Sequence, residues 1–132
     1  MIDNWRIYII IILMTMSVVD LALTYHYVSK YKKWQPEKPY KLIENNPLLV
    51  FLWNTFGLHL GMAIGSIIIL SLIYIISKSA HPIVIGILFL IMCYALHNHY
   101  VNINLLGSLI EKYPNGHLPL KTFGEVIGNN SK

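Results

Sequence analysis

Residues 7–24 of the chain read IYIIIILMTMSVVDLALT, and this stretch decides the fold. Its first half consists almost entirely of hydrocarbon side chains, whereas Asp20 and Thr24 lie in the second half, four residues apart. A carboxylate near the middle of a membrane span costs about 2.5–3.5 kcal/mol on insertion scales, so it has to face protein, water or a partner. Residues four apart share one face of a helix. The stretch therefore predicts a membrane helix with a polar face turned away from lipid.

The composition of the whole chain places it in the same class. The 132 residues are 55% hydrophobic and only 12% charged, which is typical of membrane proteins and not of soluble domains. The length allows one membrane domain, residues 1–132. Cys93 is the single cysteine, which excludes an intramolecular disulfide and a CxxC metal motif. We expect it to be a small buried side chain.

Two further apolar segments follow the first one. The expected spans cover residues 5–27, 47–76 and 82–110, and each exceeds the roughly 20 residues that a helix needs to cross the hydrocarbon core. Asn46–Pro47 and His81–Pro82 both place a capping residue before a proline at the first helical position. We expect an all-α, multi-pass membrane protein, a bundle of three transmembrane helices with a basic loop at 28–46 and a C-terminal tail at 113–132.

The basic residues are unevenly distributed between the two sides of the membrane. Five lysines lie in the loop and three follow the third span (Lys112, Lys121 and Lys132), whereas the opposite side holds only Arg6 and Lys78. Because Lys and Arg are concentrated in cytoplasmic loops, we expect the N-terminus outside and the C-terminus in the cytoplasm of a cell-membrane protein. The loop lysines form a cluster that attracts anionic head groups of the bilayer, and no recognition module points to nucleic acid. The cluster comprises Lys30, Lys32, Lys33, Lys38 and Lys41.

Polar residues of the three spans fall at a similar depth. At the usual helical rise per residue, Asp20 lies about 22 Å, His59 about 25 Å, and His97 and His99 about 22–26 Å from the outer end of their spans. We expect a polar cluster within the membrane, formed by Asp20, Thr24, Asn54, His59, His97 and Asn104. His97 and His99 point to nearly opposite sides of a helix, so they do not share one ion. On that span Cys93, His97, Tyr100 and Asn104 share one stripe, and His99 and Asn102 share another.

Three uses of this cluster are open, and hydrogen bonding between helices is the favoured one. A proton or ion pathway is the second. The third is a zinc site of an intramembrane metal-dependent hydrolase, with Asp20, His59 and His97 as ligands. The chain lacks HExxH and GxSxG motifs, which argues against a hydrolase. We therefore favour a protein that is not an enzyme and needs no cofactor.

Glycines recur at every fourth position of the second span. Gly57, Gly61 and Gly65 form a small-xxx-small pattern that permits close contact between helices, within the subunit or between copies. Three spans alone bury little surface. We expect a homo-oligomer or an accessory subunit of a membrane complex.

The motif Asp20-x-x-x-Thr24, followed by Glu44-Asn45-Asn46-Pro47, resembles a family of small polytopic membrane proteins of archaea and bacteria whose function is uncharacterised. The family pattern is D-x-x-x-T, then E-x-N-P, then a helix containing glycine. The resemblance covers residues from about 15 to 65. It implies a shared polar set and supplies no activity. The set comprises Asp20, Thr24, Glu44, Asn46 and Pro47.

Two roles remain open for Glu44. It lies just ahead of a helix N-terminus, where the helix dipole stabilises a carboxylate. Alternatively, the Glu44 side chain folds back toward Asp20 and Thr24 from the cytoplasmic side. Two carboxylates held close together would raise one pKa and share a proton or a cation.

Overall fold

The computed structural model describes residues 3–117, and this part of the chain is helical without any strand. Three helices are long and apolar enough to cross a membrane, namely α1, α3 and α4. The expectation of an all-helical chain with three such helices is confirmed. Residues 118–132, most of the expected tail, lie outside the described residues. The elements are α1 (Asn4–Trp34), the short 3-10 helix η1 (Tyr40–Leu42), α2 (Pro47–Phe56), α3 (Leu58–Ser79) and α4 (Pro82–Lys112).

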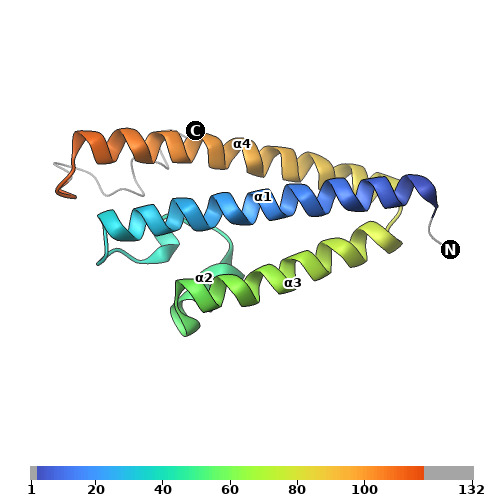
Figure 1. Ribbon diagram of the computed structural model, residues 1–132, viewed down its shortest axis with the longest axis horizontal. Coiled ribbons are helices and arrows are strands. Elements are labelled where there is room, and N and C mark those ends of the chain that lie inside the picture. The colour runs from blue at the N-terminus through green and yellow to red at the C-terminus, as the bar shows by residue number, and fades with distance from the viewer. Residues whose placement is uncertain (1–2, 118–132) are drawn as a thin grey trace.

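Helix α1 lies between α3 and α4 and packs against both (Figure 1). We call the end of the bundle at Trp34 the basic end, because Lys30, Lys32 and Lys33 lie there. There the Trp34 indole N–H donates to the carbonyl oxygen of Tyr113 at 2.8 Å, which joins the ends of α1 and α4.

The opposite end, which we call the far end, contains the short turn between α3 and α4. Arg6, near the start of α1, closes this end with its guanidinium group. One nitrogen, Nη1, donates to carbonyl oxygens at the end of α3 that have no partner within the helix. The distances are 3.4 Å to Ser77, 3.4 Å to Lys78 and 2.9 Å to Ala80.

The expected second span, residues 47–76, is wrong as a single helix, because the chain breaks at Gly57. Gly57 has φ +80° and ψ 167°, a conformation that is essentially restricted to glycine. Helix α2 ends there and folds back along α3. A Cβ on Gly61 would lie 2.6 Å from the Leu52 carbonyl oxygen, and one on Gly65 would lie 2.6 Å from Leu49 Cδ2. The glycines therefore serve close, antiparallel packing of α2 on α3 within the subunit.

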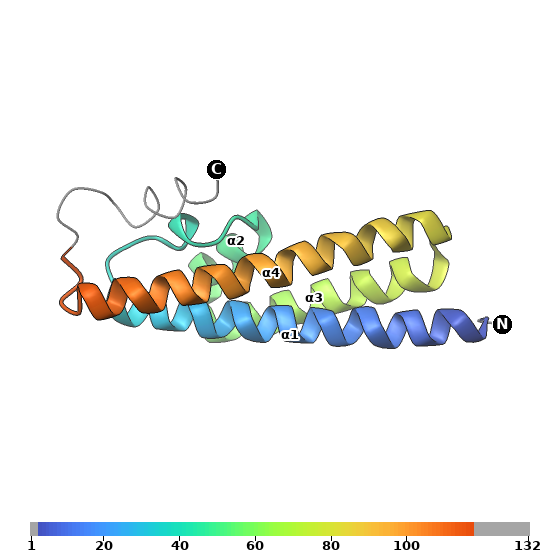
Figure 2. The ribbon, with the colours of Figure 1, turned by 90° about the horizontal axis from the view of Figure 1, so that it is seen from above.

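This fold-back changes the expected loop. Helix α2 has only 10 residues, too few to cross a bilayer, and its first turn lies beside the middle of α3, where Leu49 meets Gly65. The chain after α1 therefore returns along the bundle before α2 runs back toward the basic end (Figure 2). The expected loop 28–46 is correspondingly shorter, because α1 continues to Trp34 instead of residue 27. Helix α4 likewise continues to Lys112 instead of residue 110.

Two separate hydrophobic cores hold the bundle together. The core near the basic end contains side chains from all four α-helices, whereas the core near the far end contains only aliphatic residues and methionine from α1, α3 and α4. The first comprises Leu21, Tyr27, Val28, Tyr31, Leu49, Trp53, Met62 and Leu106. The second comprises Leu13, Ile73, Ile85 and Met92.

Much of the outer surface of the long helices is apolar. Ile67 on α3 is 68% exposed and Leu90 on α4 is 67% exposed. Cys93 is exposed as well, so the expectation that it is buried is wrong. It lies on the side of α4 that faces away from α1.

Candidate functional site

The candidate site begins with one turn of α1 near its middle. The Thr24 hydroxyl donates to the carbonyl oxygen of Asp20 at 2.8 Å, one turn earlier in the same helix. This bond occupies the single hydroxyl proton of Thr24, so its oxygen is left as an acceptor. The Asp20 carboxylate and the Thr24 oxygen thus form a pair of acceptors on one face of α1.

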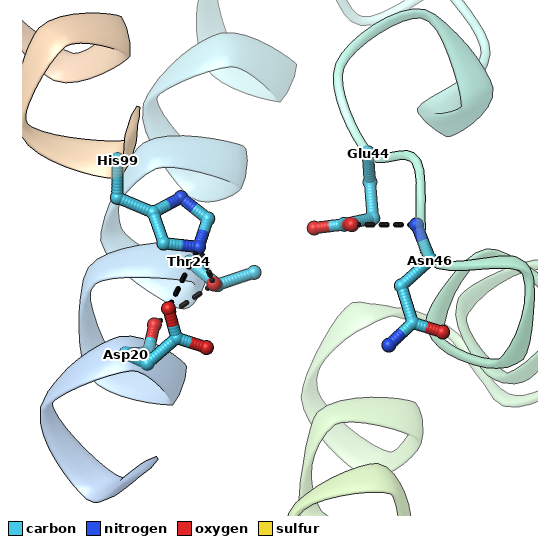
Figure 3. Close-up of polar contacts among 5 residues, drawn as sticks. All are labelled: Asp20, Thr24, Glu44, Asn46 and His99. Atoms are coloured by element: carbon cyan, nitrogen blue, oxygen red, sulfur yellow. Dashed lines mark hydrogen bonds and ion pairs between the residues drawn. The ribbon is translucent and has the colours of Figure 1, made fainter. Parts of the chain in front are cut away.

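His99 of α4 meets both acceptors (Figure 3). Its Nε2 lies 3.0 Å from Asp20 Oδ1 and 3.1 Å from Thr24 Oγ1. Because the Thr24 oxygen is left as an acceptor, Nε2 carries a proton and donates to it, with the Asp20 carboxylate at ion-pair distance. The imidazole and the carboxylate are only 17% and 23% exposed, respectively. A partly buried contact between an imidazole and a carboxylate therefore joins α1 to α4.

The second nitrogen of His99 has no such partner. His99 Nδ1 is buried and makes no hydrogen bond within residues 3–117. Buried polar atoms in proteins are nearly always paired with protein or with water. Nδ1 therefore departs from this rule among the described residues.

The other wall of the site comes from the segment that precedes α2. Asn46 caps this helix, and its side-chain oxygen accepts from the Leu48 N–H at 3.0 Å. Glu44 Oε1 accepts from the Asn46 N–H at 2.7 Å, while its carboxylate is directed toward His99 (Figure 3). The two roles expected for Glu44 therefore coexist: it caps the start of α2, and it faces Asp20 and Thr24 from the opposite wall.

These two walls enclose a partly open cavity of about 330 Å³. Asp20, Thr24 and Glu44 line it together with His99. Several amides and apolar side chains complete the lining: Asn45, Asn46, Asn98 and Asn102, with Leu21, Ile43, Leu49, Ile69, Ile91, Tyr94 and Ala95. The cavity is thus rich in hydrogen-bonding groups in an otherwise apolar bundle.

The surroundings of Glu44 favour its protonated form. Burial raises the pKa of this carboxyl above its usual value, and the negative charge of Asp20 acts in the same direction. The Asn46 N–H and His99 lower it by favouring the charged form, without reversing the shift. A carboxyl with a raised pKa next to a second carboxylate is suited to hold a proton.

The expected polar cluster is only partly brought together. Asp20 and Thr24 line the cavity, but His59 is exposed and lies outside the lining. A hydrogen bond of 2.8 Å instead joins His59 Nδ1 to the Tyr25 hydroxyl. This bond joins α3 to α1. The other three expected members are exposed and lie outside the cavity lining: Asn54, His97 and Asn104.

The proposed zinc ligands do not converge. Within residues 3–117, no group of three or more His, Cys, Asp and Glu side chains is arranged to hold a metal ion. His97 is directed outward and His59 binds Tyr25, so neither reaches Asp20. The triple of Asp20, His59 and His97 is therefore wrong as a ligand set in this conformation.

His99 is the main residue that sequence reasoning assigned incorrectly. Residues 97 and 99 face opposite sides of α4, and the choice between them depends on which side of α4 packs on α1. His99 and Asn102 were recognised as one stripe, and this stripe lines the cavity. The shared level expected for Asp20 and His99 agrees with their contact.

In the comparison with known proteins, no family model, no curated protein and no solved structure matches the chain.

Proposed function

We propose that this protein is a non-enzymatic module of the cell membrane, in which a polar layer joins three spanning helices and which acts as a subunit of a membrane assembly. The 3.0 Å contact between Asp20 Oδ1 and His99 Nε2 carries the proposal. It joins α1 to α4 through two side chains that lipid cannot satisfy. The bond between Tyr25 and His59 joins α1 to α3 in the same manner.

The uneven burial of the spanning helices supports a role within an assembly. In the most apolar stretch of α4, only 11% is buried inside the protein, whereas the corresponding share for the most apolar stretch of α3 is 28%. Helix α4 nevertheless carries polar side chains that face outward, among them His97. Such side chains are costly on a surface that faces lipid alone. A further membrane-embedded subunit next to α4 would cover them.

The proposal includes an orientation with the N-terminus outside and the basic end in the cytoplasm. Lys112 ends α4 at the basic end, while Arg6 and Lys78 lie at the far end. This asymmetry follows the rule that cytoplasmic ends carry the excess of Lys and Arg.

The basic end would contact anionic head groups of the cytoplasmic leaflet. Lys32 is not available for this role, because its ammonium donates to the carbonyl oxygens of Pro36 and Lys38 at 2.9 and 2.8 Å. It also lies 4.6 Å from the centre of the Tyr40 ring. The remaining lysines of the expected cluster would supply the attraction, each worth about 1 kcal/mol near the surface. They are Lys30, Lys33, Lys38 and Lys41.

Thermal unfolding in detergent micelles tests the proposal. Asp20→Asn should lower the unfolding temperature, because the amide lacks the charge that pairs with His99. Asp3→Asn is the matched control, since Asp3 is exposed and makes no side-chain cap bond at the start of α1. Equal unfolding temperatures for the wild type and Asp20→Asn would refute a structural role of the polar layer.

The cavity supports a second candidate function, the holding or passage of protons or a small cation. Irregular backbone at membrane depth is tolerated where it is buried in protein or lines a water-filled cavity. The segment before α2 is such backbone, and it brings Glu44 to the cavity that holds Asp20 and His99. An imidazole exchanges protons near neutral pH, and two carboxyls line the same cavity as that of His99.

Proton flux into liposomes separates this candidate from the first. If the cavity carries protons, liposomes containing the wild type should acidify faster than those containing Asp20→Asn. His97→Gln is the matched control, because His97 lies outside the cavity lining. Equal flux for the wild type and Asp20→Asn would remove the candidate. The metal-dependent hydrolase is not proposed, because its expected ligands are dispersed over the described residues.

A further inference from the structure

One face of α4 is left uncovered by the rest of the described chain. Exposed residues recur along this face at heptad spacing. The residues follow one another at intervals of four and three, which is the pattern with which two helices pack side by side in a left-handed coil. The buried residues of α4 belong to other positions, for example Ile85 and Met92. We call the exposed set the α4 seam: Gly86, Leu90, Cys93, His97, Tyr100 and Asn104.

Half of the α4 seam is polar. The side chains of His97, Tyr100 and Asn104 make no hydrogen bond or ion pair within residues 3–117, although the Asn104 backbone oxygen accepts from Ser108. His97 lies about 22 Å along α4 from its start at the far end, well inside a hydrocarbon core of roughly 30 Å. An imidazole facing acyl chains at that depth is costly. His97 therefore requires a covering surface that offers hydrogen bonds, and Tyr100 and Asn104 continue the same face toward the basic end.

We propose that the α4 seam is the interface between two copies of this chain, packed in parallel about a twofold axis along the membrane normal. Copies inserted into one membrane share an orientation, so each seam residue meets its own counterpart at the same depth. A neutral imidazole, an amide and a phenol each contain a donor and an acceptor, so each pairs with its own copy. A different protein would need matching polar groups at every one of these depths. The seam carries no formal charge, so the two copies do not repel each other across it.

The dimensions of the α4 seam suit such a contact. It extends over 19 residues from Gly86 to Asn104, about 27 Å along the helix, close to the thickness of the hydrocarbon core. A Cβ on Gly86 would meet nothing within 4 Å, so the space beside it is open to a second helix. Small residues such as Gly86 and Cys93 let helices approach closely. This inference rests on the proposed role within an assembly, and it names the partner and the surface.

Cys93 allows a test on the unmodified chain, because it is the only cysteine and belongs to the α4 seam. Copper phenanthroline, with oxygen as the electron acceptor, removes two electrons and two protons from a pair of thiols and leaves one disulfide. We expect a covalent dimer of the full chain in membranes, which a reductant converts back to monomer. A disulfide requires Cα atoms within about 7 Å, so the bond forms only if the two seams meet.

A matched control moves the cysteine to the other side of α4. The double variant Cys93→Ser, Ile91→Cys carries its only thiol on Ile91, which is 56% exposed and lies outside the seam. We expect roughly tenfold less cross-linking for this variant, because its Cα atoms would lie beyond disulfide reach. Equal yields at the two positions, no dimer at Cys93, or an adduct of Cys93 with a different protein alone would each overturn the proposal.

Molar mass in detergent gives an independent measurement. His97→Leu combined with Asn104→Leu should raise the dimer dissociation constant about tenfold, because two interhelix hydrogen bonds are lost. Both side chains are directed outward, so the unfolding temperature of the monomer should not fall. An unchanged dissociation constant would contradict the proposal.

Asp20→Asn distinguishes this inference from the proposed function. This substitution should lower the unfolding temperature of the bundle and leave the dimer dissociation constant unchanged. If the wild type is monomeric and Cys93 does not cross-link, the interface is refuted, while the unfolding temperature of Asp20→Asn still decides whether the polar layer is structural.

Discussion

The two halves of the bundle satisfy their buried polar groups in different ways. In the far half, Ser17 and Ser77 are buried, and each hydroxyl donates to a carbonyl oxygen one turn earlier in its own helix, at 2.7 and 2.6 Å. In the basic half, Asp20 depends on His99 of another helix. The two serines are satisfied within their own helices, whichever helix lies beside them. Asp20, in contrast, needs a particular helix, α4, beside it.

The difference shows where the bundle acquires its specificity. An aliphatic core such as that of Leu13, Ile73 and Ile85 tolerates small rotations of the helices, because any apolar surface satisfies it. A carboxylate and an imidazole have to meet at hydrogen-bond distance. The basic half also adds α2, whose Trp53 is 1% exposed and lies edge-on to Tyr40, with ring centres 5.3 Å apart.

The largest difference in the free energy of unfolding should be that between Asp20→Ala and Ser17→Ala. Removing Asp20 leaves the His99 imidazole in the bundle interior without its charged partner, which should lower the free energy of unfolding by about 2–4 kcal/mol. Ser17→Ala removes a bond within a single helix and should cost less than about 0.5 kcal/mol. Denaturant titration in mixed micelles measures both values. Equal losses would mean that the halves do not differ as described.

A smaller difference in the free energy of unfolding is expected between alanine substitutions at a glycine of the α2–α3 contact and at a glycine in open space. Gly61→Ala places a methyl group 2.6 Å from the Leu52 carbonyl oxygen and should cost about 1–3 kcal/mol. A Cβ on Gly107 of α4 meets nothing within 4 Å, so Gly107→Ala should be neutral or stabilise by up to about 1 kcal/mol. The same titration compares them. A neutral Gly61→Ala would show that α2 does not lie against α3.

The smallest contrast concerns the two helix caps that precede prolines. Asn46→Ala removes the acceptor of the Leu48 N–H and should destabilise by about 1 kcal/mol. His81→Ala removes a longer bond of 3.3 Å from the exposed Ile83 N–H, and we expect less than about 0.5 kcal/mol. Hydrogen exchange of the first turn of α2 and of α4 reports each loss separately. Faster exchange in α4 than in α2 would reverse the predicted order.

The sequence predicted the helical class, the three apolar segments and both proline caps, because these depend on local composition and on single residues. It did not predict the break at Gly57. Three glycines at four-residue spacing in an apolar run are compatible with a continuous helix, and only the packing of α2 on α3 decides otherwise.

The polar site was predicted in part for a related reason. The cap at Asn46 follows from its place directly before Pro47, and it agrees with the structure. The choice of His97 over His99 failed because it depends on the rotation of α4 about its axis, which no local pattern specifies. The position of Glu44 beside the cavity depends on the fold-back of α2, so it could be stated only as an alternative.

The most direct test of the central claim is a double-mutant cycle between Asp20→Asn and His99→Gln, with His97→Gln in place of His99→Gln as the control cycle. If Asp20 holds α1 to α4 through His99, the free energies of unfolding should show a coupling of about 1 kcal/mol or more in the first cycle, and additivity within about 0.5 kcal/mol in the second. Additive effects in the first cycle, or an equal coupling to His97, would contradict the account.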